Sequence, residues 1–190
     1  MTVPDSPSAS APADQAVEHP EAVAATGSAL RSLLQGVASP VVVVTVDGGR
    51  GATIGSFTSV SLDPPLVSFN VTHGTRFHDA IGSASVWGVH LLSATQAAVA
   101  EHFALPDLDG PELLAPFEHV APASGPPLLR HTLGILLCRP YTRFEAGDHT
   151  VMVGEVEDLI PGAGEAPLLY YRQSYRGIGD EVEASRRTAL

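Results

Sequence analysis

Side chains that can hold a ligand are concentrated in one stretch, residues 51–66, which is rich in hydroxyl groups. Its Ser and Thr residues are Thr53, Ser56, Thr58, Ser59 and Ser61. Neighbouring residues of a strand point to opposite faces, so these hydroxyls would lie on both faces of a single strand. The pattern fits either a half-exposed strand or a wall of small donors for a polar, planar or phosphorylated ligand.

A second polar group, His73-Gly74-Thr75-Arg76, precedes a predicted short helix through Ala80 and Ile81. Free amides at a helix N-terminus, a hydroxyl and an arginine together can bind a phosphate. Taken alone, the same residues are explained more simply by an ordinary helix cap at Thr75 and a surface charge at Arg76. The sequence contains no lysine, so any anion held by charge is held by Arg, His or backbone amides.

The elements that must position these groups are mostly strands. The β-branched run at 40–46 predicts a strand buried on both faces, and Asp47-Gly48-Gly49 predicts a hairpin turn into a return strand over 51–63. Further strands are expected at 66–71, 86–92, 132–144, 149–159 and 168–171, with one short strand at 117–120 inside a long loop, 104–127. Short helices are expected from Ser28 to Val37, and from Ser93 or Thr95 to Phe103. Without βαβ alternation, the pattern indicates a mainly β antiparallel barrel with two or three short flanking helices.

Length and composition indicate one globular domain with a tail at each end. The chain has 190 residues, of which 44% are hydrophobic. Residues 1–27 are rich in Ser, Ala and Pro and are expected to be disordered or loosely attached, residues 28–177 form the domain, and residues 178–190 form a polar tail. The absence of a long apolar run or a signal-peptide pattern indicates a cytoplasmic protein with no membrane partner.

Several classes of site are excluded by what the sequence lacks. The net charge of −11 and the scattered arginines argue against a nucleic-acid surface. The single Cys138 excludes a multi-cysteine metal site, and no two histidines have the spacing of a known ligand pair, so no metal is expected. There is no dinucleotide-binding glycine fingerprint, P-loop, zinc-protease motif or nucleophile elbow.

Taken together, the segments resemble the short-chain flavin reductases, the reductase components of two-component flavin monooxygenases. The resemblance covers residues 28–177 and rests on four motifs: Ser56-Phe57-Thr58-Ser59-Val60-Ser61-Leu62-Asp63-Pro64-Pro65, Thr75-Arg76-x-His78-Asp79, Gly147-Asp148-His149 and Leu168-Leu169-Tyr170-Tyr171-Arg172-x-x-Tyr175-Arg176. It implies the FMN-binding split barrel, an antiparallel Greek-key fold. It also implies an NAD(P)H:flavin oxidoreductase that reduces FMN or FAD with NADH or NADPH and supplies a partner monooxygenase.

The resemblance also implies roles for individual residues. It implies that the flavin ring and ribityl chain are contacted by Thr53, Gly55, Ser56, Phe57, Thr58 and Ser59. It also implies that the flavin phosphate is bound by Thr75, Arg76 and His78. His149 and Asp148 are expected to position the nicotinamide, and the family implies a homodimer with its sites near the interface. A hydride transfer between two stacked rings needs neither a catalytic triad nor a metal.

Two positions depart from many relatives, Gly55, where a small polar residue is common, and Phe77, where a threonine is common. They motivate one alternative to the reductase, a flavin-dependent oxygenase or oxidase that acts directly on an organic substrate. A second alternative is a non-catalytic flavin-binding or partner-docking module that uses the acidic N-terminal tail as its docking segment.

Overall fold

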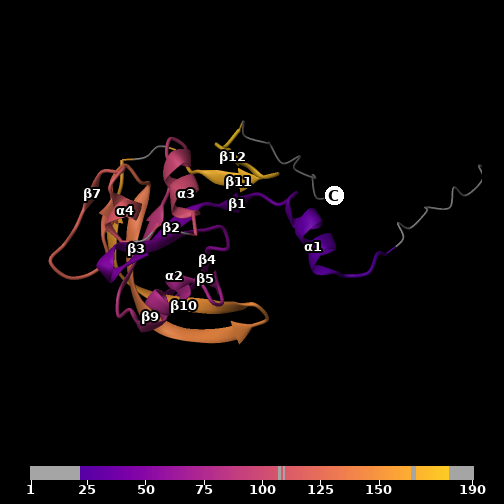
Figure 1. Ribbon diagram of the computed structural model, residues 1–190, viewed down its shortest axis with the longest axis horizontal. Helices are drawn as coiled ribbons and strands as arrows, with labels where there is room; N and C mark the ends of the chain where they lie inside the picture. Colours follow the sequence, from indigo (N-terminus) through magenta and orange to yellow (C-terminus); the bar gives the residue numbers. More distant parts are fainter. Residues whose placement is uncertain (1–21, 107, 109, 164–165, 180–190) are drawn as a thin grey trace, which may run out of the picture.

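A computed structural model describes residues 22–106, 108, 110–163 and 166–179, and its centre is a seven-stranded antiparallel sheet (Figure 1). Its strands follow the order β3 (Arg50–Ile54), β2 (Val42–Val46), β6 (Trp87–Leu91), β9 (Gly134–Ala146), β10 (His149–Pro161), β5 (Pro65–Thr72) and β4 (Thr58–Leu62). The sheet curls so that β3, at one end of this order, contacts β5 near the other. A mainly β, antiparallel barrel is therefore confirmed.

Smaller elements cover the outside of the barrel. One short sheet is formed by β1 (Ser39–Pro40), β11 (Leu169–Tyr171) and β12 (Ser174–Arg176), and another by β7 (His119–Val120) and β8 (Leu128–Leu129). The helices are α1 (Gly27–Leu34), the 3₁₀ turn η1 (Asp47–Gly49), α2 (Arg76–Ser83), α3 (Ala97–Phe103) and α4 (Pro111–Leu114). The helices are all short, as the sequence predicts.

The valine-rich strand β2 is buried on both faces, as its composition predicts. Val42 and Val44 face a core inside the barrel, whereas Val43 faces a second core under α3 and α4. Trp87 is fully buried in the inner core, with its ring centroid 5.5 Å from that of Phe69 in an edge-to-face arrangement. A Cβ on Gly154 would lie 2.9 Å from the Trp87 ring, so only glycine lets β10 pass this close.

The expectation of one return strand over residues 51–63 is wrong. The stretch forms two strands, β3 and β4, which pair with β2 and β5 respectively. The chain changes partner at Gly55-Ser56-Phe57, where the Ser56 hydroxyl accepts a hydrogen bond from the Asn70 amide at 2.9 Å and Phe57 packs against the inner core. The dense hydroxyls therefore belong to two strands with different surroundings.

Other boundaries differ from the sequence-based prediction in smaller ways. The strand expected at 40–46 is interrupted at Val41, and α4 and β12 were not anticipated. Thr26 rather than Ser28 caps α1, because the Thr26 hydroxyl accepts from the Ala29 amide at 3.2 Å. Gln96 precedes α3 in place of Ser93 or Thr95 as the cap. The expected tails fall largely on residues 1–21 and 180–190, which lie outside the described residues.

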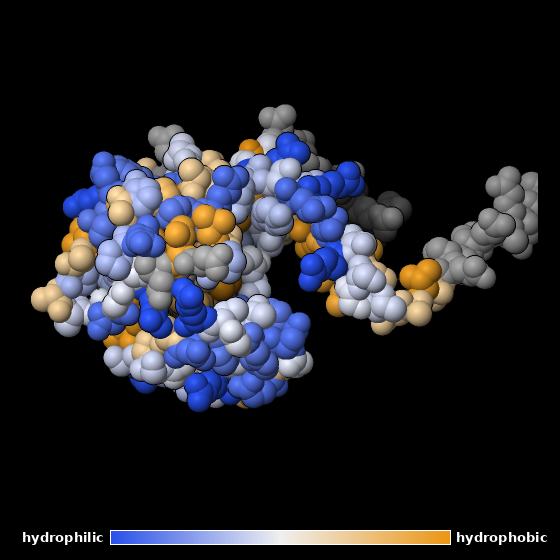
Figure 2. All heavy atoms as spheres, in the orientation of Figure 1, coloured by the Kyte–Doolittle hydropathy of each residue, from blue (hydrophilic) through white to orange (hydrophobic). Residues whose placement is uncertain are grey.

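Helix α1 stands away from the barrel, and apolar side chains are visible on it across an open gap (Figure 2). Leu30, Leu33, Leu34 and Val37 are between 52% and 75% exposed. Its link to the domain includes a backbone hydrogen bond of 3.0 Å from the Arg172 amide to the Gln35 carbonyl. The helix therefore presents an apolar face that the barrel does not cover. Within the described part of the chain, no helix is long and apolar enough to cross a membrane.

Candidate functional site

An open cleft of about 700 Å³ lies beside the edge strand β3. Its walls are β3, the end of β5, the loop that leads into α2 and the segment after α3, and His149 lies at its rim. This volume is in the range of sites that bind small molecules and cofactors. The cleft brings together parts of the chain that are almost 100 residues apart.

The β3 wall offers mainly backbone to a ligand. The Thr53 hydroxyl donates to the Ala100 carbonyl at 2.7 Å, and the Ser56 hydroxyl accepts from Asn70, so both already have partners. A Cβ on Gly55 would approach only the Ser39 hydroxyl oxygen, at 3.5 Å, which leaves open space above this backbone. Because β3 ends the sheet, its outer edge has no strand partner among the described residues. A planar ligand can therefore reach peptide groups along this edge.

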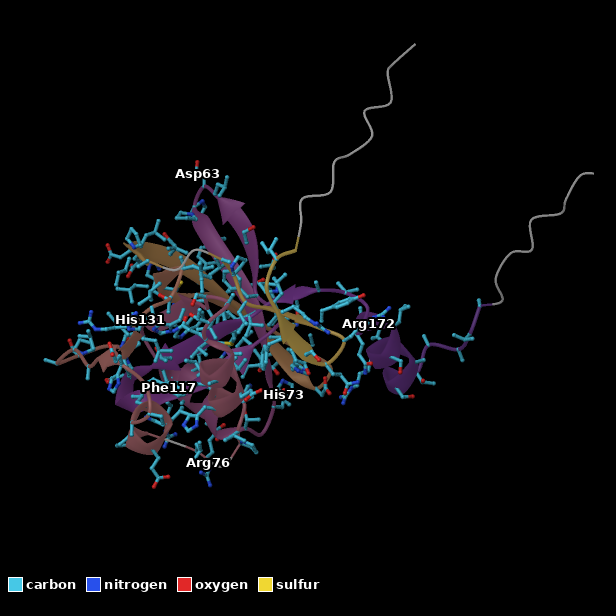
Figure 3. The ribbon with its side chains drawn as sticks, turned by 90° about the horizontal axis from the view of Figure 1, so that it is seen from above. Asp63, His73, Arg76, Phe117, His131 and Arg172 are labelled. Carbon is cyan, nitrogen blue, oxygen red and sulfur yellow. The ribbon has the colours of Figure 1, made fainter. Side chains whose placement is uncertain are left out.

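The loop before α2 leads to a positively charged side chain, Arg76, at the start of the helix. The Thr75 hydroxyl accepts from the His78 amide at 3.1 Å and donates to the Thr72 carbonyl at 3.0 Å, so this side chain caps the helix. Arg76 lines the cleft, and its guanidinium has no hydrogen-bond or ion-pair partner within the described ranges. In Figure 3, Arg76 lies at the edge of the domain opposite Asp63, which marks the tip of the β4–β5 hairpin. The arrangement leaves Arg76 available for an anion beside a helix N-terminus.

The turn between β9 and β10 carries His149 on the rim. Its Nδ1 lies 2.7 Å from Asp148 Oδ1, and its Nε2 lies 3.1 Å from the Thr72 hydroxyl oxygen. The hydrogen bond to His149 is the main cause that lowers the pKa of Asp148, and the charge of His149 adds to it. The Asp148 side chain is exposed and stays ionised at neutral pH. Asp148 and Thr72 thus fix the orientation of the imidazole through hydrogen bonds to its two ring nitrogens.

A cluster of polar side chains lies behind this turn. His73 Nε2 is 2.8 Å from a Glu145 carboxylate oxygen and 3.1 Å from Thr150 Oγ1, and His78 Nε2 is 2.9 Å from the same hydroxyl. The His73 amide also donates to the Asp148 carbonyl at 3.0 Å. These contacts tie the end of β5 and the start of α2 to the β9–β10 turn. No group of His, Cys, Asp or Glu in the described part of the chain is arranged to hold a metal ion.

The structure brings together six of the residues expected in the site. Those that line the cleft are Thr53, Gly55, Ser56, Thr75, Arg76 and His149. The others lie outside its lining: Phe57 packs on the inner core, Thr58 and Ser59 lie on β4, His78 contacts Thr150, and Asp148 contacts His149 from outside.

Further lining residues were not anticipated from the sequence, namely Arg50, Asn70, Thr72, Phe103, Leu105 and Pro106. Nothing in the sequence, beyond their place at a predicted strand, marks Asn70 and Thr72 as residues of a binding site. Phe103 ends α3, and the residues after it begin the segment expected as a long loop, 104–127; a loop of this length in a compact domain is usually functional.

The donors fit a planar, phosphorylated ligand such as a flavin nucleotide. An arginine without a partner among the described residues lies at a helix start, a strand edge offers peptide groups, and Gly55 leaves room for a ring. Phe103, Leu105 and Pro106 supply an apolar wall. The imidazole at the rim can contact a second ligand that lies over the first.

Comparison with known proteins gives a consistent result. The flavin reductase like domain matches residues 34–179. The reductase component of 4-hydroxyphenylacetate 3-monooxygenase from Thermus thermophilus is 34% identical over 153 residues, which cover 79% of this chain and 95% of that protein. An NADH-dependent flavin reductase from a Rhodococcus species is also 34% identical, over 78% of this chain and 85% of its own length.

Solved structures show the same fold. The NADH:FAD oxidoreductase SgcE6 of Streptomyces globisporus, in complex with NAD and FAD fragments, superposes with a TM-score of 0.73 at 31% identity. The match covers 81% of this chain and 93% of that one. BorF, the flavin reductase component of a bacterial two-component tryptophan halogenase, also matches at 31% identity and a TM-score of 0.73, over 82% of this chain and all of its own.

Proposed function

The chain belongs to the flavin reductase like domain family, and we propose that it reduces FMN or FAD with NADH in the cleft beside β3. It is an NADH-dependent flavin reductase, an oxidoreductase of the type that serves two-component monooxygenases. The observation that carries the location is the cleft in which Arg76, the β3 edge and His149 come together. The family match over residues 34–179 confirms the resemblance of the sequence to the short-chain flavin reductases.

Each wall of the cleft binds a different part of the flavin. Arg76 and the amides at the start of α2 bind its phosphate through charge-assisted hydrogen bonds. The outer edge of β3 near Gly55 binds the polar edge of the ring system through peptide groups. The apolar segment from Phe103 to Pro106 shields the ring from water.

His149 seats the nicotinamide on the exposed side of the cleft. The flavin supplies the redox chemistry, since its ring system accepts the hydride that NADH gives up. The protein must bring the two rings to close distance and hold them there. With its two ring nitrogens held by Asp148 and Thr72, the imidazole is fixed beside the cleft, where its ring can orient the incoming nicotinamide. This role is positioning, and no side chain is required to transfer a proton.

The oxygenase alternative finds little support in the two departures that suggested it. Phe77 is 8% exposed and packs into the inner core, although it also lines the cleft, so packing accounts for an apolar residue at this position. Gly55 leaves open space beside β3 that a ring can occupy.

We further propose that the protein is a cytoplasmic homodimer that passes reduced flavin to a monooxygenase. The uncovered apolar face of α1 and the exposed Phe144 on β9 support a second copy as the covering partner. The dependence of the reaction on NADH supports a location in the cytoplasm. A monomer in sedimentation velocity would contradict the dimer. Purified oxygenase that gains no activity from this protein and NADH would contradict the transfer.

The reductase assignment is tested by adding FMN, FAD or riboflavin to the purified full-length protein with NADH. We expect NADH absorbance to fall in proportion to protein concentration, with bleaching of the flavin under anaerobic conditions. Oxidation of NADH no faster than with free flavin alone would overturn the assignment.

His149→Ala is expected to raise the KM for NADH about three- to tenfold, the effect of losing one contact with the coenzyme worth about 1 kcal/mol. The Kd for FMN should stay nearly unchanged, because the proposed flavin contacts lie on β3 and α2. Steady-state kinetics and fluorescence titration with FMN measure the two effects separately. Loss of FMN binding instead would place His149 on the flavin.

A further inference from the structure

We propose that Thr72 is the positioning residue for His149, holding its imidazole in the orientation that receives the nicotinamide. The inference rests on the proposed function, in which His149 contacts the coenzyme. It concerns a hydroxyl at the end of β5 that neither the sequence motifs nor the family resemblance identified.

The contact is a side-chain hydrogen bond between neighbouring strands. His149, the first residue of β10, pairs with Thr72, the last residue of β5, and Thr72 Oγ1 lies 3.1 Å from His149 Nε2. The side chain of His149 is 38% exposed, so packing alone does not fix the ring. Its two hydrogen bonds, to Asp148 and to Thr72, therefore determine its orientation.

The chemistry of the partners assigns the protons. The Asp148 carboxylate can only accept, so Nδ1 of His149 carries a hydrogen. In the neutral ring Nε2 is then an acceptor, and the Thr72 hydroxyl donates to it. In the charged ring Nε2 carries a hydrogen and the same hydroxyl accepts. Thr72 thus satisfies Nε2 in either protonation state, which no apolar residue of the same shape can do.

The position of Thr72 is itself fixed on two sides. Its carbonyl accepts from the Thr75 hydroxyl at 3.0 Å, and the next residue, His73, donates its amide to the Asp148 carbonyl at 3.0 Å. Behind the turn, the Thr150 hydroxyl lies within hydrogen-bond distance of the His73 ring and of the Glu145 carboxylate. The hydroxyl that holds His149 is therefore attached to a rigid support, as positioning requires.

The test compares Thr72→Val with Thr72→Ser. Valine keeps the shape and strand preference of threonine and removes only the hydroxyl, whereas serine keeps the hydroxyl. We expect Thr72→Val to raise the KM for NADH about three- to tenfold with little change in kcat or in the Kd for FMN. Thr72→Ser should restore a KM near that of the wild type. Thr142→Val, at an exposed strand position outside the cleft, is the matched control.

A spectroscopic measurement separates positioning from a general structural effect. In ¹⁵N-histidine-labelled protein, with His149 identified by its loss in His149→Ala, the Nε2 resonance should move in Thr72→Val toward that of a nitrogen without a hydrogen bond. It should return in Thr72→Ser. A general structural role would alter other histidine signals and would not be rescued by serine.

The outcomes distinguish this inference from the proposed function. If His149→Ala raises the KM for NADH and Thr72→Val does not, the role of Thr72 is overturned and the coenzyme site stands. If Thr72→Val weakens FMN binding, Thr72 contacts the flavin directly and the positioning role is overturned. If His149→Ala leaves the KM unchanged, the proposed coenzyme site itself fails, whatever Thr72 does to the ring.

Discussion

Replacing Arg76 by alanine is expected to weaken FMN binding by about 1.5–3 kcal/mol, roughly a ten- to hundredfold increase in Kd. The guanidinium lines the cleft at the start of α2 and has no partner within the described residues, so it is available to pair with the phosphate. Riboflavin lacks that phosphate and should lose little affinity. Fluorescence titration of both flavins against the variant measures the difference directly.

Two further variants sharpen this test. Arg76→Lys keeps the charge but cannot form the paired hydrogen bonds of a guanidinium, so it should fall between alanine and the wild type. Arg176→Ala removes an exposed arginine on β12, outside the cleft, and controls for the change in net charge. Equal losses for FMN and riboflavin in Arg76→Ala would show that Arg76 does not bind the phosphate.

Acid is expected to destabilise the fold through His90 by about 3 kcal/mol between pH 7 and pH 4. His90 is fully buried outside the barrel, where its Nδ1 donates to the Val43 carbonyl at 3.0 Å. Burial lowers its pKa from 6.5 to about 4, against the opposing effect of nearby backbone carbonyls. The unfolded chain takes up the proton near pH 6.5 and the folded chain only near pH 4. Stability is therefore full above pH 6.5 and falls as the pH drops between these values.

Denaturant unfolding at pH 7 and at pH 4 tests the contribution of His90. Carboxylates also contribute to acid unfolding, so the informative quantity is the difference between the wild type and His90→Gln. Glutamine keeps a donor for the Val43 carbonyl but does not titrate, so its loss of stability on acidification should be smaller by about 3 kcal/mol. His102→Gln, at a less buried histidine on α3, is the control for replacing a histidine by glutamine elsewhere in the domain. An unchanged pH dependence in His90→Gln would refute the role of His90.

Much of the fold followed from local sequence patterns. The valine run of β2, the alternation in β10 and the Gly-rich turn at Gly48 and Gly49 each carry a strong signal. The split of residues 51–63 into two strands did not follow, because the change of partner depends on Phe57 reaching the inner core and on Ser56 meeting Asn70. Such long-range contacts have no counterpart in a short window of sequence.

The site was predictable to a similar extent. Motifs located β3, Arg76 and His149, but they could not show which hydroxyls were already engaged. Thr53 is bound to Ala100 and Thr75 caps α2, so neither hydroxyl is as available as its position in a motif suggests. Thr72 was missed because its role depends on cross-strand pairing with His149, which only the three-dimensional register shows.

The edge of β3, which has no strand partner in the described part of the chain, has a consequence for the protein in the absence of flavin. An unpaired strand edge is a place where another chain can add a strand and begin to aggregate. β3 is only five residues long and begins with a charged residue, Arg50, which limits this risk. A flavin bound along the same edge would cover it as well, and would favour the folded state by mass action. The ligand that the edge recognises would then also protect the protein from self-association.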